Sequence, residues 1–342
     1  MPKIQELVTK YSGGDLDPEH IIARYPWIAE RNKSCILSPD SDGLLCGLFM
    51  AKYLGWKIVG YYDGKVLLIK NNASPTATNT VFLDMEICRR NVRSVGHHMV
   101  LLNKNHRPEI FENYENCIQP NILRGYDKNT QFQLKYPLAT IHLLIAILGP
   151  KFALEIPKSA IAPLFFVDGT FNVLYLYPEN VLNWLNFLGI NKPESPLKQI
   201  FMHDHYTVYS QIEAMTEFFR KRDQFNIKGE RGDKFIISGK DSAAKNIEQL
   251  SSGGYSITKD RKVKLINFLT LLSETTGWDF NAEDWPLDDL RKYQFTKSDF
   301  KSRKWTLSNR DFQKFIELNP LSWAITSGDN IEFTLEEPDR LS

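Results

Sequence analysis

Short apolar segments that alternate with helical patterns constrain the fold of this chain most strongly. Residues 34–37 (SCIL) and 80–83 (TVFL) have the length and composition of buried strands. Residues 44–54 (LLCGLFMAKYL) have helical length and precede Gly55, a residue type that commonly ends helices. Strands that alternate with helices predict an α/β fold with a mostly parallel sheet that helices cover on both faces.

The pattern continues in four further segments. Residues 57–61 (KIVGY) and 66–69 (VLLI) predict two strands around a turn at residues 63–64 (DG). Residues 137–148 predict a buried helix, and residues 163–167 (PLFFV) predict one more strand.

The chain has 342 residues, a length typical of about two domains. The alternation stops at residues 191–198 (NKPESPLK), where two prolines and mixed charges interrupt it. We therefore predict a catalytic domain over residues 1–190 and a divergent, mainly helical C-terminal domain over residues 199–342, which would bind a substrate or a partner. The C-terminal elements are predicted as helices at residues 208–222 and 260–274 and a hairpin at residues 322–335 with its turn at residues 327–330.

Composition narrows the functional class. Lys and Arg (42) nearly balance Asp and Glu (41), which excludes a uniformly basic nucleic-acid binder. The apolar runs fall far short of the ~20 residues that span a bilayer. Cys35, Cys46, Cys88 and Cys117 form no CxxC pair, which argues against structural zinc and for a reducing compartment. We therefore expect a cytoplasmic protein without a membrane partner.

Acidic residues follow three separate predicted strands. In a parallel α/β sheet the carboxyl ends of the strands share one edge, where ligands collect. Carboxylates gathered there without a cation would repel one another, and a mixture of carboxylates and imidazoles suits Mn²⁺ or Mg²⁺. The side chains concerned are Asp40, Asp42, Asp84 and Asp168, together with the pair His97 and His98 after residues 94–96.

Each of these side chains also has a purely structural interpretation. Asp40 or Asp42 could cap the helix that begins near residue 44, and Asp84 could cap a helix that begins near Glu86. Asp168 could belong to an ordinary turn. Histidine pairs more often lie at the surface or in the core than at a metal. The shared position at strand ends is what favours a common site.

The same residues belong to motifs with a characteristic order. The motifs are SPDSDG (38–43), VFLDME (81–86), VGHHM (95–99), KYPLATIHLLIAILG (135–149) and FFVDGTF (165–171). In order and spacing they resemble the N-terminal catalytic domain of the DHH phosphoesterase family, which includes RecJ-like exonucleases, oligoribonucleases and family II pyrophosphatases. The resemblance covers roughly residues 30–190.

The resemblance implies a DHH-type domain with two Mn²⁺ or Mg²⁺ ions and a role for each residue. The implied metal ligands are Asp40 for the first ion, Asp42, His97 and Asp168 for the second, and Asp84 as a bridge between the two. The implied catalytic residues are Asp84, His97 and His98, the last in contact with a substrate phosphate.

Three positions depart from the family's pattern. Ser38 stands near an upstream Asp or His of the first-metal site, and a hydroxyl is a weaker ligand than a carboxylate for a hard metal ion. Gly96 stands where the family has the Asp that supports the neighbouring histidine, a role that Asp63 or Glu86 could take over. Residues 252–255 (SGGY) lack the histidine of the family's GGGH-type phosphate-binding turn, so we interpret them as a simple turn.

A basic segment lies in the second half of the chain. Residues 220–264 carry 12 Lys and Arg against 6 Asp and Glu. Such an excess can neutralise the phosphates of a single strand, although solvated helix faces give similar counts. The candidate substrate-binding residues are Arg220, Lys221, Arg222, Arg261 and Lys262, together with His98.

The sequence therefore predicts a metal-dependent phosphoesterase, foremost a nuclease or phosphodiesterase that hydrolyses single-stranded DNA, RNA or a short oligonucleotide through two-metal activation of water. One alternative is a DHH-fold protein with weak or no activity that binds nucleic acid or a protein partner, as a eukaryotic replisome component of this family does. A second alternative is a hydrolase of a small nucleotide or pyrophosphate. Ser38 and Gly96 favour the scaffold, whereas the six retained Asp and His side chains favour the enzyme.

Overall fold

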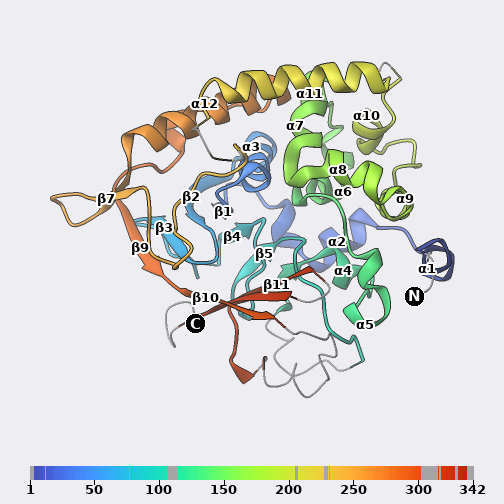
Figure 1. The fold of residues 1–342 in the computed structure, drawn as a ribbon, viewed down its shortest axis with the longest axis horizontal. Coiled ribbons are helices and arrows are strands. Elements are labelled where there is room, and N and C mark those ends of the chain that lie inside the picture. The colour runs from blue at the N-terminus through green and yellow to red at the C-terminus, as the bar shows by residue number, and fades with distance from the viewer. Residues whose placement is uncertain are drawn as a thin grey trace.

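A nine-stranded mixed sheet lies at the centre of the protein, and helices flank it (Figure 1). The strand order is β6-β5-β4-β1-β2-β3-β9-β8-β7. The computed structural model describes residues 4–11, 13–76, 78–105, 114–204, 207–226, 230, 232–301, 315, 317–327 and 330–336. The strands are β1 (Ser34–Leu37), β2 (Lys57–Tyr62), β3 (Val66–Lys70), β4 (Thr80–Leu83), β5 (Arg93–Val95), β6 (Cys117–Ile118), β7 (Ile247–Gln249), β8 (Tyr255–Ile257) and β9 (Leu290–Gln294).

The sheet is parallel in one half and antiparallel in the other. Neighbouring strands from β6 through β5, β4 and β1 to β2 pair in parallel, whereas β2–β3, β3–β9, β9–β8 and β8–β7 pair antiparallel. The α/β prediction is thus confirmed, but the sheet is mixed instead of mostly parallel. The difference arises because three strands of the second half extend the sheet beyond the β2–β3 hairpin.

Helix α3 (Ser41–Leu54) lies at the centre of the helical layer. It packs on β1, β2 and β4 and against α6 (Thr140–Phe152) and α12 (Lys259–Thr276). Gly55 ends α3 in a left-handed conformation (φ 66°), as predicted. The remaining α-helices are α1 (Ile4–Tyr11), α2 (Pro18–Arg24), α4 (Pro120–Leu123), α5 (Lys128–Gln131), α7 (Ile161–Phe166), α8 (Thr170–Leu176), α9 (Pro178–Phe187), α10 (Leu197–Phe201) and α11 (Val208–Asp223). Short 3-10 helices span Pro26–Ala29, Phe132–Leu134, Lys158–Ala160, Val167–Gly169 and Ala282–Asp284.

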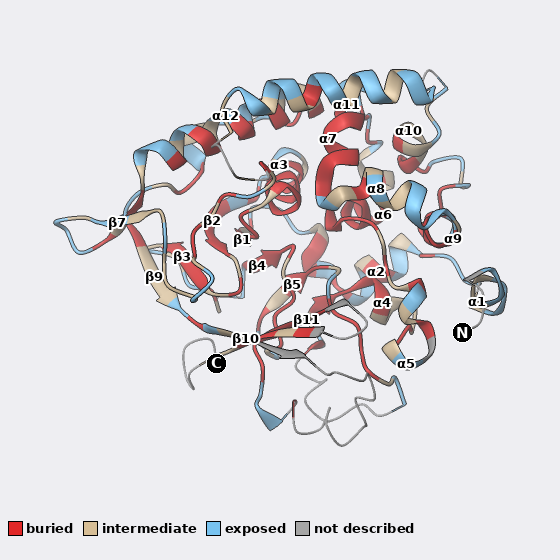
Figure 2. Cartoon of the chain, viewed as in Figure 1, coloured by how far each residue is buried: buried red, intermediate tan, exposed pale blue. Residues whose placement is uncertain are grey.

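Alternate residues of the central strands enter two different cores. In β1, Cys35 and Leu37 join the large core beneath the helices, whereas Ile36 faces a smaller cluster with Phe82 and Phe295. Figure 2 shows that the central strands are mostly buried and that α11 and α12 are exposed along their outer sides. Burial on both faces explains why these strands are continuous apolar runs in the sequence.

One predicted strand is wrong. Residues 163–167 belong mostly to the buried helix α7, so Asp168 follows a helix and not a strand. All six residues of α7 are buried, and a short run that is apolar on every side has no periodicity that separates helix from strand. The helix that Asp84 was suggested to cap is also absent, because residues 85–89 form no regular structure.

The second half is less helical than predicted. The two predicted helices are confirmed as α11 and α12, and the hairpin at 322–335 is confirmed as two strands, with residues 328 and 329 of its turn outside the described residues. Strands β7, β8 and β9 were not predicted. The hairpin belongs to a three-stranded antiparallel sheet of order β10-β12-β11, formed by β10 (Thr296–Lys301), β11 (Ser322–Ser327) and β12 (Asn330–Leu335).

Residues 191–196 of the predicted linker at 191–198 lie between α9 and α10, largely in turns, and residues 197 and 198 begin α10. Elements on both sides of it contribute to the central sheet and to the large core. The division into domains at 1–190 and 199–342 stays a prediction.

The helical run Lys158–Leu176 is long and apolar enough to cross a membrane by length and composition alone. Half of it is buried inside the protein, so it is weak evidence for a membrane span. The cytoplasmic location and the lack of a membrane partner stay predictions.

Candidate metal centre

The parallel half of the sheet brings three strand ends to the same level. Leu37 at the end of β1 pairs with Leu83 at the end of β4, which in turn pairs with Val95 at the end of β5. Asp84 follows Leu83 directly, and His97 follows Val95 by two residues. The register therefore places both side chains at one edge of the sheet, where ligands of α/β proteins usually bind.

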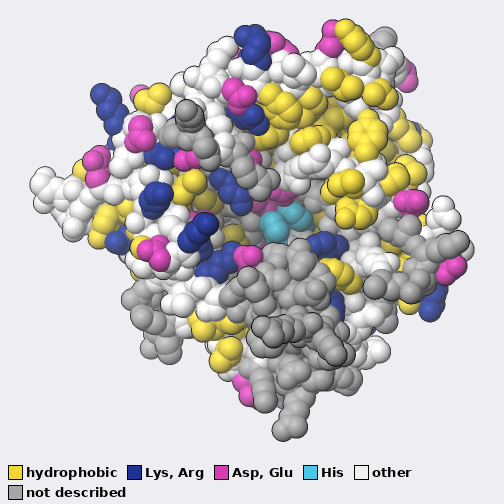
Figure 3. Space-filling model, viewed as in Figure 1, with side chains coloured by type: hydrophobic (Ala, Val, Ile, Leu, Met, Phe, Trp, Pro, Cys, Tyr) yellow, Lys and Arg dark blue, Asp and Glu magenta, His cyan; other side chains and the backbone are white. Residues whose placement is uncertain are grey.

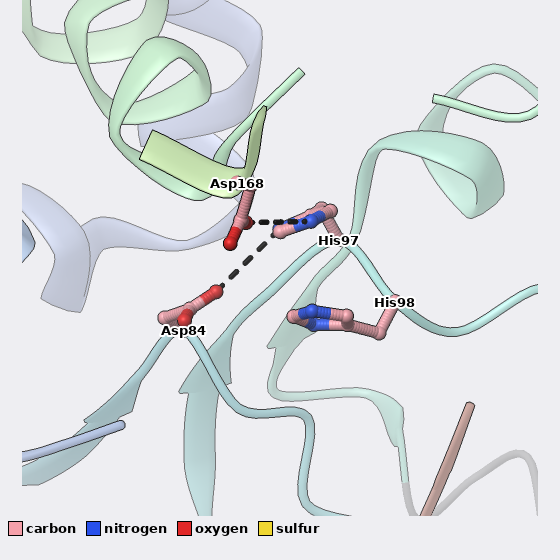
Figure 4. A group of neighbouring side chains, drawn as sticks. All are labelled: Asp84, His97, His98 and Asp168. Atoms are coloured by element: carbon pink, nitrogen blue, oxygen red, sulfur yellow. Dashed lines mark ion pairs between the residues drawn. The ribbon is translucent and has the colours of Figure 1, made fainter. Parts of the chain in front are cut away.

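Four side chains converge at this edge. Ligand atoms of Asp84, His97, His98 and Asp168 all lie within 4.8 Å of one another. Figure 4 shows His97 between the two aspartates: its Nε2 lies 3.2 Å from Asp168 Oδ2, and its Nδ1 lies 3.5 Å from Asp84 Oδ1. The His98 ring stacks beside it at a centroid distance of 4.0 Å. We call these four residues the metal cluster, because their donor atoms suit a divalent ion.

Both aspartates of the metal cluster have strained backbones. Asp84 has φ 60° and Asp168 has φ 50°, in the left-handed region that residues with a Cβ rarely adopt. Such conformations cost roughly 1–3 kcal/mol each and concentrate at functional sites. At Asp168 the strain accompanies a kink between α7 and α8, and Gly169 (φ 66°) continues it. The kink directs Asp168 towards the strand ends.

The charges of the metal cluster are unbalanced. Burial raises the pKa of Asp84, and the neighbouring carboxylates of Asp40 and Asp168 raise it further. Burial also favours a neutral Asp168, but its hydrogen bond with His97 outweighs that effect and lowers its pKa. Burial opposes the charge of His97 as well, yet the same bond raises the histidine's pKa. Asp84 is therefore the carboxylate that lacks a compensating charge.

Asp84 also carries a polar atom without a partner. Its Oδ2 is buried and accepts no hydrogen bond from any residue that the structure describes. An unpaired buried carboxylate oxygen costs free energy that a bound cation would recover. The orphan oxygen next to two histidines and a second carboxylate is the feature that best fits a metal ion.

Thr140 belongs to the site although the sequence gave no reason to select it. Its hydroxyl donates to Asp84 Oδ1 at 2.8 Å and lies 2.8 Å from His97 Nδ1. Because the hydroxyl has a single hydrogen, it accepts from His97 Nδ1–H, which leaves Nε2 as the nitrogen that faces the interior of the cluster. Thr140 is the first residue of α6, so the only advance signal was its place at the start of a predicted helix.

Asp42 lies beside the metal cluster but holds a helix. Its Oδ2 accepts from Thr140 N–H at 2.6 Å and its Oδ1 from Ile141 N–H at 2.9 Å, at the N-terminus of α6. Its Oδ2 also lies 3.7 Å from His97 Nδ1. Burial raises the pKa of Asp42, and Asp84 adds to the increase. A carboxylate at a helix N-terminus is favourable, so this side chain fixes the position of α6 and Thr140.

Asp40 caps α3, as the structural interpretation suggested. Its Oδ1 accepts from Gly43 N–H at 3.2 Å, and its Oδ2 lies 3.9 Å from Lys234 Nζ. Gly43 is required here because a Cβ would lie 2.1 Å from the Ser38 carbonyl oxygen. Asp40 and Asp42 lie outside the four residues that converge, and their metal roles stay predictions.

Glu86 occupies the position next to Gly96. A Cβ atom on Gly96 would lie 2.6 Å from Glu86 Cδ and 2.7 Å from its Oε2. Glu86 is buried, its Oε1 accepts from Met99 N–H at 2.9 Å, and its Oε2 lies 3.8 Å from His98 Nδ1. Burial alone would raise its pKa, but the interaction with His98 outweighs this and lowers it. A carboxylate thus supports the histidine pair from another strand end.

The second half of the chain reaches into the site. A segment that we call the strap, residues 233–238, runs antiparallel to the loop after β1: Ser41 N–H donates to Asp233 O at 2.8 Å, and Phe235 N–H donates to Pro39 O at 2.7 Å. Lys234 lies on the strap with 61% of its side chain exposed beside Asp40. The strap is one wall of a cavity of about 470 Å³ that Asp84 and His98 also line.

The basic residues selected from the sequence lie elsewhere. They are on α11 and α12, and none of them lines the cavity beside the metal cluster. Acidic neighbours pair with them: Glu217 with Arg220 and Lys221, Asp223 with Arg222, Glu230 with Arg261, and Asp288 with Lys262. Residues 252–254 lie in the turn between β7 and β8, with Gly253 at φ 88°, and Tyr255 begins β8, which confirms the interpretation of residues 252–255 as a turn.

Comparisons with known proteins return no relative. No family model, curated protein or solved structure matches this chain. The resemblance to the DHH family therefore depends on the motifs and on the arrangement of the residues themselves.

Proposed function

We propose that the protein is a metal-dependent phosphoesterase, foremost a nuclease or phosphodiesterase that acts on single-stranded or short nucleic acid at the metal cluster. The observation that carries the proposal is the buried, unpartnered Oδ2 of Asp84 within a group of four convergent ligand side chains. Carboxylate and imidazole donors in one small group suit Mn²⁺ or Mg²⁺. The resemblance to DHH phosphoesterases supports the same chemistry.

Some residues of the site would bind the metal ion, and others would orient these ligands. Asp84, His97 and Asp168 would hold the ion, with Thr140 fixing the orientation of both Asp84 and His97. A divalent ion bound there supplies an activated water and stabilises negative charge on the phosphate. As the family resemblance implies, Asp42 would join the ion held by His97 and Asp168, Asp40 would hold a further ion, and Asp84 would be shared between the two.

His98 is placed to bind the substrate. Its side chain is 42% exposed and lines the cavity, and Glu86 lies beside its Nδ1. Burial and the charge of His97 oppose its protonation, yet Glu86 and Asp84 outweigh them and raise the pKa of His98. A raised pKa favours the positively charged imidazolium, which attracts a phosphate oxygen.

A second candidate is a DHH-fold scaffold that binds nucleic acid or a protein without hydrolysing it. The observation in its favour is that Asp40 and Asp42 already serve as acceptors for backbone N–H groups at the starts of α3 and α6. If those bonds persist, only one ion would bind, and a two-metal mechanism would fail. A small nucleotide or pyrophosphate is the remaining substrate class for the same site.

Hydrolysis assays separate these functions. End-labelled single-stranded DNA and RNA, dinucleotides and pyrophosphate are incubated with the protein and Mn²⁺, beside the variant Asp84→Ala. The exposed Asp279, which forms an ion pair with Lys52 at the surface, provides the matched control Asp279→Ala. The proposal expects products from wild type and Asp279→Ala and none from Asp84→Ala. Nucleic-acid binding without products from any substrate would favour the scaffold.

A further inference from the structure

The cavity beside the metal cluster extends well beyond it. Its walls include Asp84 and His98, Lys234 on the strap, and three more lysines from distant parts of the chain. Its volume of about 470 Å³ is in the range of small-molecule sites, larger than one phosphate needs. The cavity therefore has room for more of a ligand than one phosphate at the metal cluster.

The three lysines outside the strap are Lys65, Lys240 and Lys297. Lys65 lies in the turn between β2 and β3, and its Nζ donates to Gly239 O at 2.7 Å, which links the residue after the strap to the β2–β3 hairpin. Lys297 lies on β10, with its Nζ 2.8 Å from Glu332 Oε2. Lys240 is exposed and has no ion-pair partner among the described residues. Each ammonium group keeps hydrogen-bond donors for a ligand.

A second cavity continues from these lysines. It measures about 460 Å³ and shares Lys240 and Lys297 with the first, while Gln294 and Thr296 add polar walls. The two cavities thus share both lysines as walls, and we call them together the groove. Basic side chains gather on the same face as the histidines in Figure 3. The groove suits a linear anion better than a compact one.

We propose that Lys240 and Lys297 bind a phosphate of a linear oligonucleotide that follows the phosphate at the metal cluster. This inference depends on the proposed function and specifies its substrate as a phosphodiester chain, in preference to a mononucleotide or pyrophosphate. The charge count over residues 220–264 includes Lys240 but not Lys297, so it could not show that the two lysines meet in the folded protein. His98 contacts the phosphate at the cluster, and the lysines contact the next.

Binding without hydrolysis tests this inference. Fluorescence anisotropy with EDTA present measures the affinity for a labelled oligothymidylate of about five nucleotides. The variants are Lys240→Gln and Lys240→Gln/Lys297→Gln. Lys57→Gln, at the exposed start of β2 on the opposite edge of the sheet, is the matched control. Unlabelled thymidine monophosphate and pyrophosphate serve as competitors.

The expected result is an affinity about 10-fold lower for the double variant, with a salt dependence shallower by about 0.7 per lost phosphate contact. Lys57→Gln should bind as wild type does, and thymidine monophosphate should compete weakly. An unchanged affinity and salt slope in the double variant, equal loss in Lys57→Gln, or no binding by wild type would overturn the inference. Because no metal is present, this assay does not test hydrolysis; lysine-dependent binding here, together with no products in the Mn²⁺ assay, would reject only the proposed function.

Discussion

The carboxylate of Glu86 fills the space beside Gly96, where a Cβ atom would lie 2.6 Å from Glu86 Cδ. The family that this chain resembles carries its supporting Asp at the position of Gly96. Here the carboxylate instead comes from the segment after β4. It accepts a hydrogen bond from Met99 N–H and lies close to His98 Nδ1. We therefore predict that only one of the two positions can carry the supporting carboxylate.

The pair predicts the outcome of exchanging the two residues. Gly96→Asp alone should overlap Glu86, and Glu86→Gly alone should remove the carboxylate, so each single variant should lose about 10–100-fold in Mn²⁺ affinity or activity. The double variant Glu86→Gly/Gly96→Asp should recover much of that loss. Calorimetric titration with Mn²⁺ measures the affinities.

One result of this exchange would contradict the prediction. If the double variant loses as much as the two single variants combined, the positions are independent, and Glu86 does not replace the missing Asp. Circular dichroism of each variant checks that the fold is retained.

The hydrogen bonds of the Thr140 hydroxyl predict that this residue affects both stability and metal affinity. Thr140→Val keeps the shape of the side chain but leaves Asp84 Oδ1 and His97 Nδ1 without their shared partner. We expect a loss of about 1–3 kcal/mol in the free energy of unfolding, from urea titration. Mn²⁺ affinity should also fall by about 10-fold or more. Thr140→Ser, which keeps the hydroxyl, should stay close to wild type, and identical behaviour of Ser and Val would refute the role.

The strand ends could be predicted from the sequence because their apolar runs are short, buried and followed by polar residues. That pattern correctly located Asp84 and His97, since parallel register alone brings them together. Asp168 was selected for a wrong reason, because it joins the cluster through a kink between two helices and not through a strand end. Thr140 was missed because its partner Asp84 is 56 residues away in sequence.

Counting charges along the second half of the chain could not distinguish lysines and arginines that are free to bind a ligand from those that form ion pairs. The dense basic segment is largely neutralised by acidic neighbours that only the fold brings into contact, such as Glu230 beside Arg261. Strands β7–β9 were missed because three-residue strands are too short for a period of two to be visible, and β9 is only partly buried.

The burial of His142 predicts that the free energy of unfolding falls in acid. It is fully buried on α6, its Nδ1 accepts from Ala139 N–H at 3.2 Å, and burial lowers its pKa to about 4. A histidine whose folded pKa lies below the unfolded value stabilises the protein above about pH 6.5, and this contribution disappears as the pH falls towards 4. The loss should amount to roughly 3 kcal/mol.

Urea unfolding at about pH 7 and about pH 4.5 measures this effect. The variant His142→Gln cannot gain the proton, so its stability should fall less between the two pH values. His20→Gln changes an exposed histidine and serves as the control. Equal pH dependence in all three proteins would show that His142 does not carry the effect.

The raised pKa values of Asp84 and Asp42 predict how stabilisation by metal depends on pH. Burial and neighbouring acids favour the protonated carboxyls in the metal-free protein. Their contribution to stability is therefore full below the unfolded pKa and is lost as the pH rises through the folded pKa. Mn²⁺ binds the deprotonated form, so it should raise the melting temperature more at about pH 8 than at about pH 5.

Thermal unfolding with and without Mn²⁺ provides the measurement. At free Mn²⁺ about 100 times the Kd, the stabilisation should reach about 2.7 kcal/mol in wild type. Asp84→Asn should lose most of it, whereas Asp279→Asn should not. A stabilisation that is independent of pH, or that persists in Asp84→Asn, would place the ion elsewhere.

The central claim is that the metal cluster binds the ion that drives phosphoester hydrolysis. Its most direct test is a Mn²⁺ titration in which electron paramagnetic resonance measures bound Mn²⁺ and a labelled single-stranded oligonucleotide measures product in the same samples. We predict that occupancy and rate rise together in wild type and that both are lost in Asp84→Ala. Full occupancy without product, or product formation that Asp84→Ala leaves unchanged, would contradict the claim.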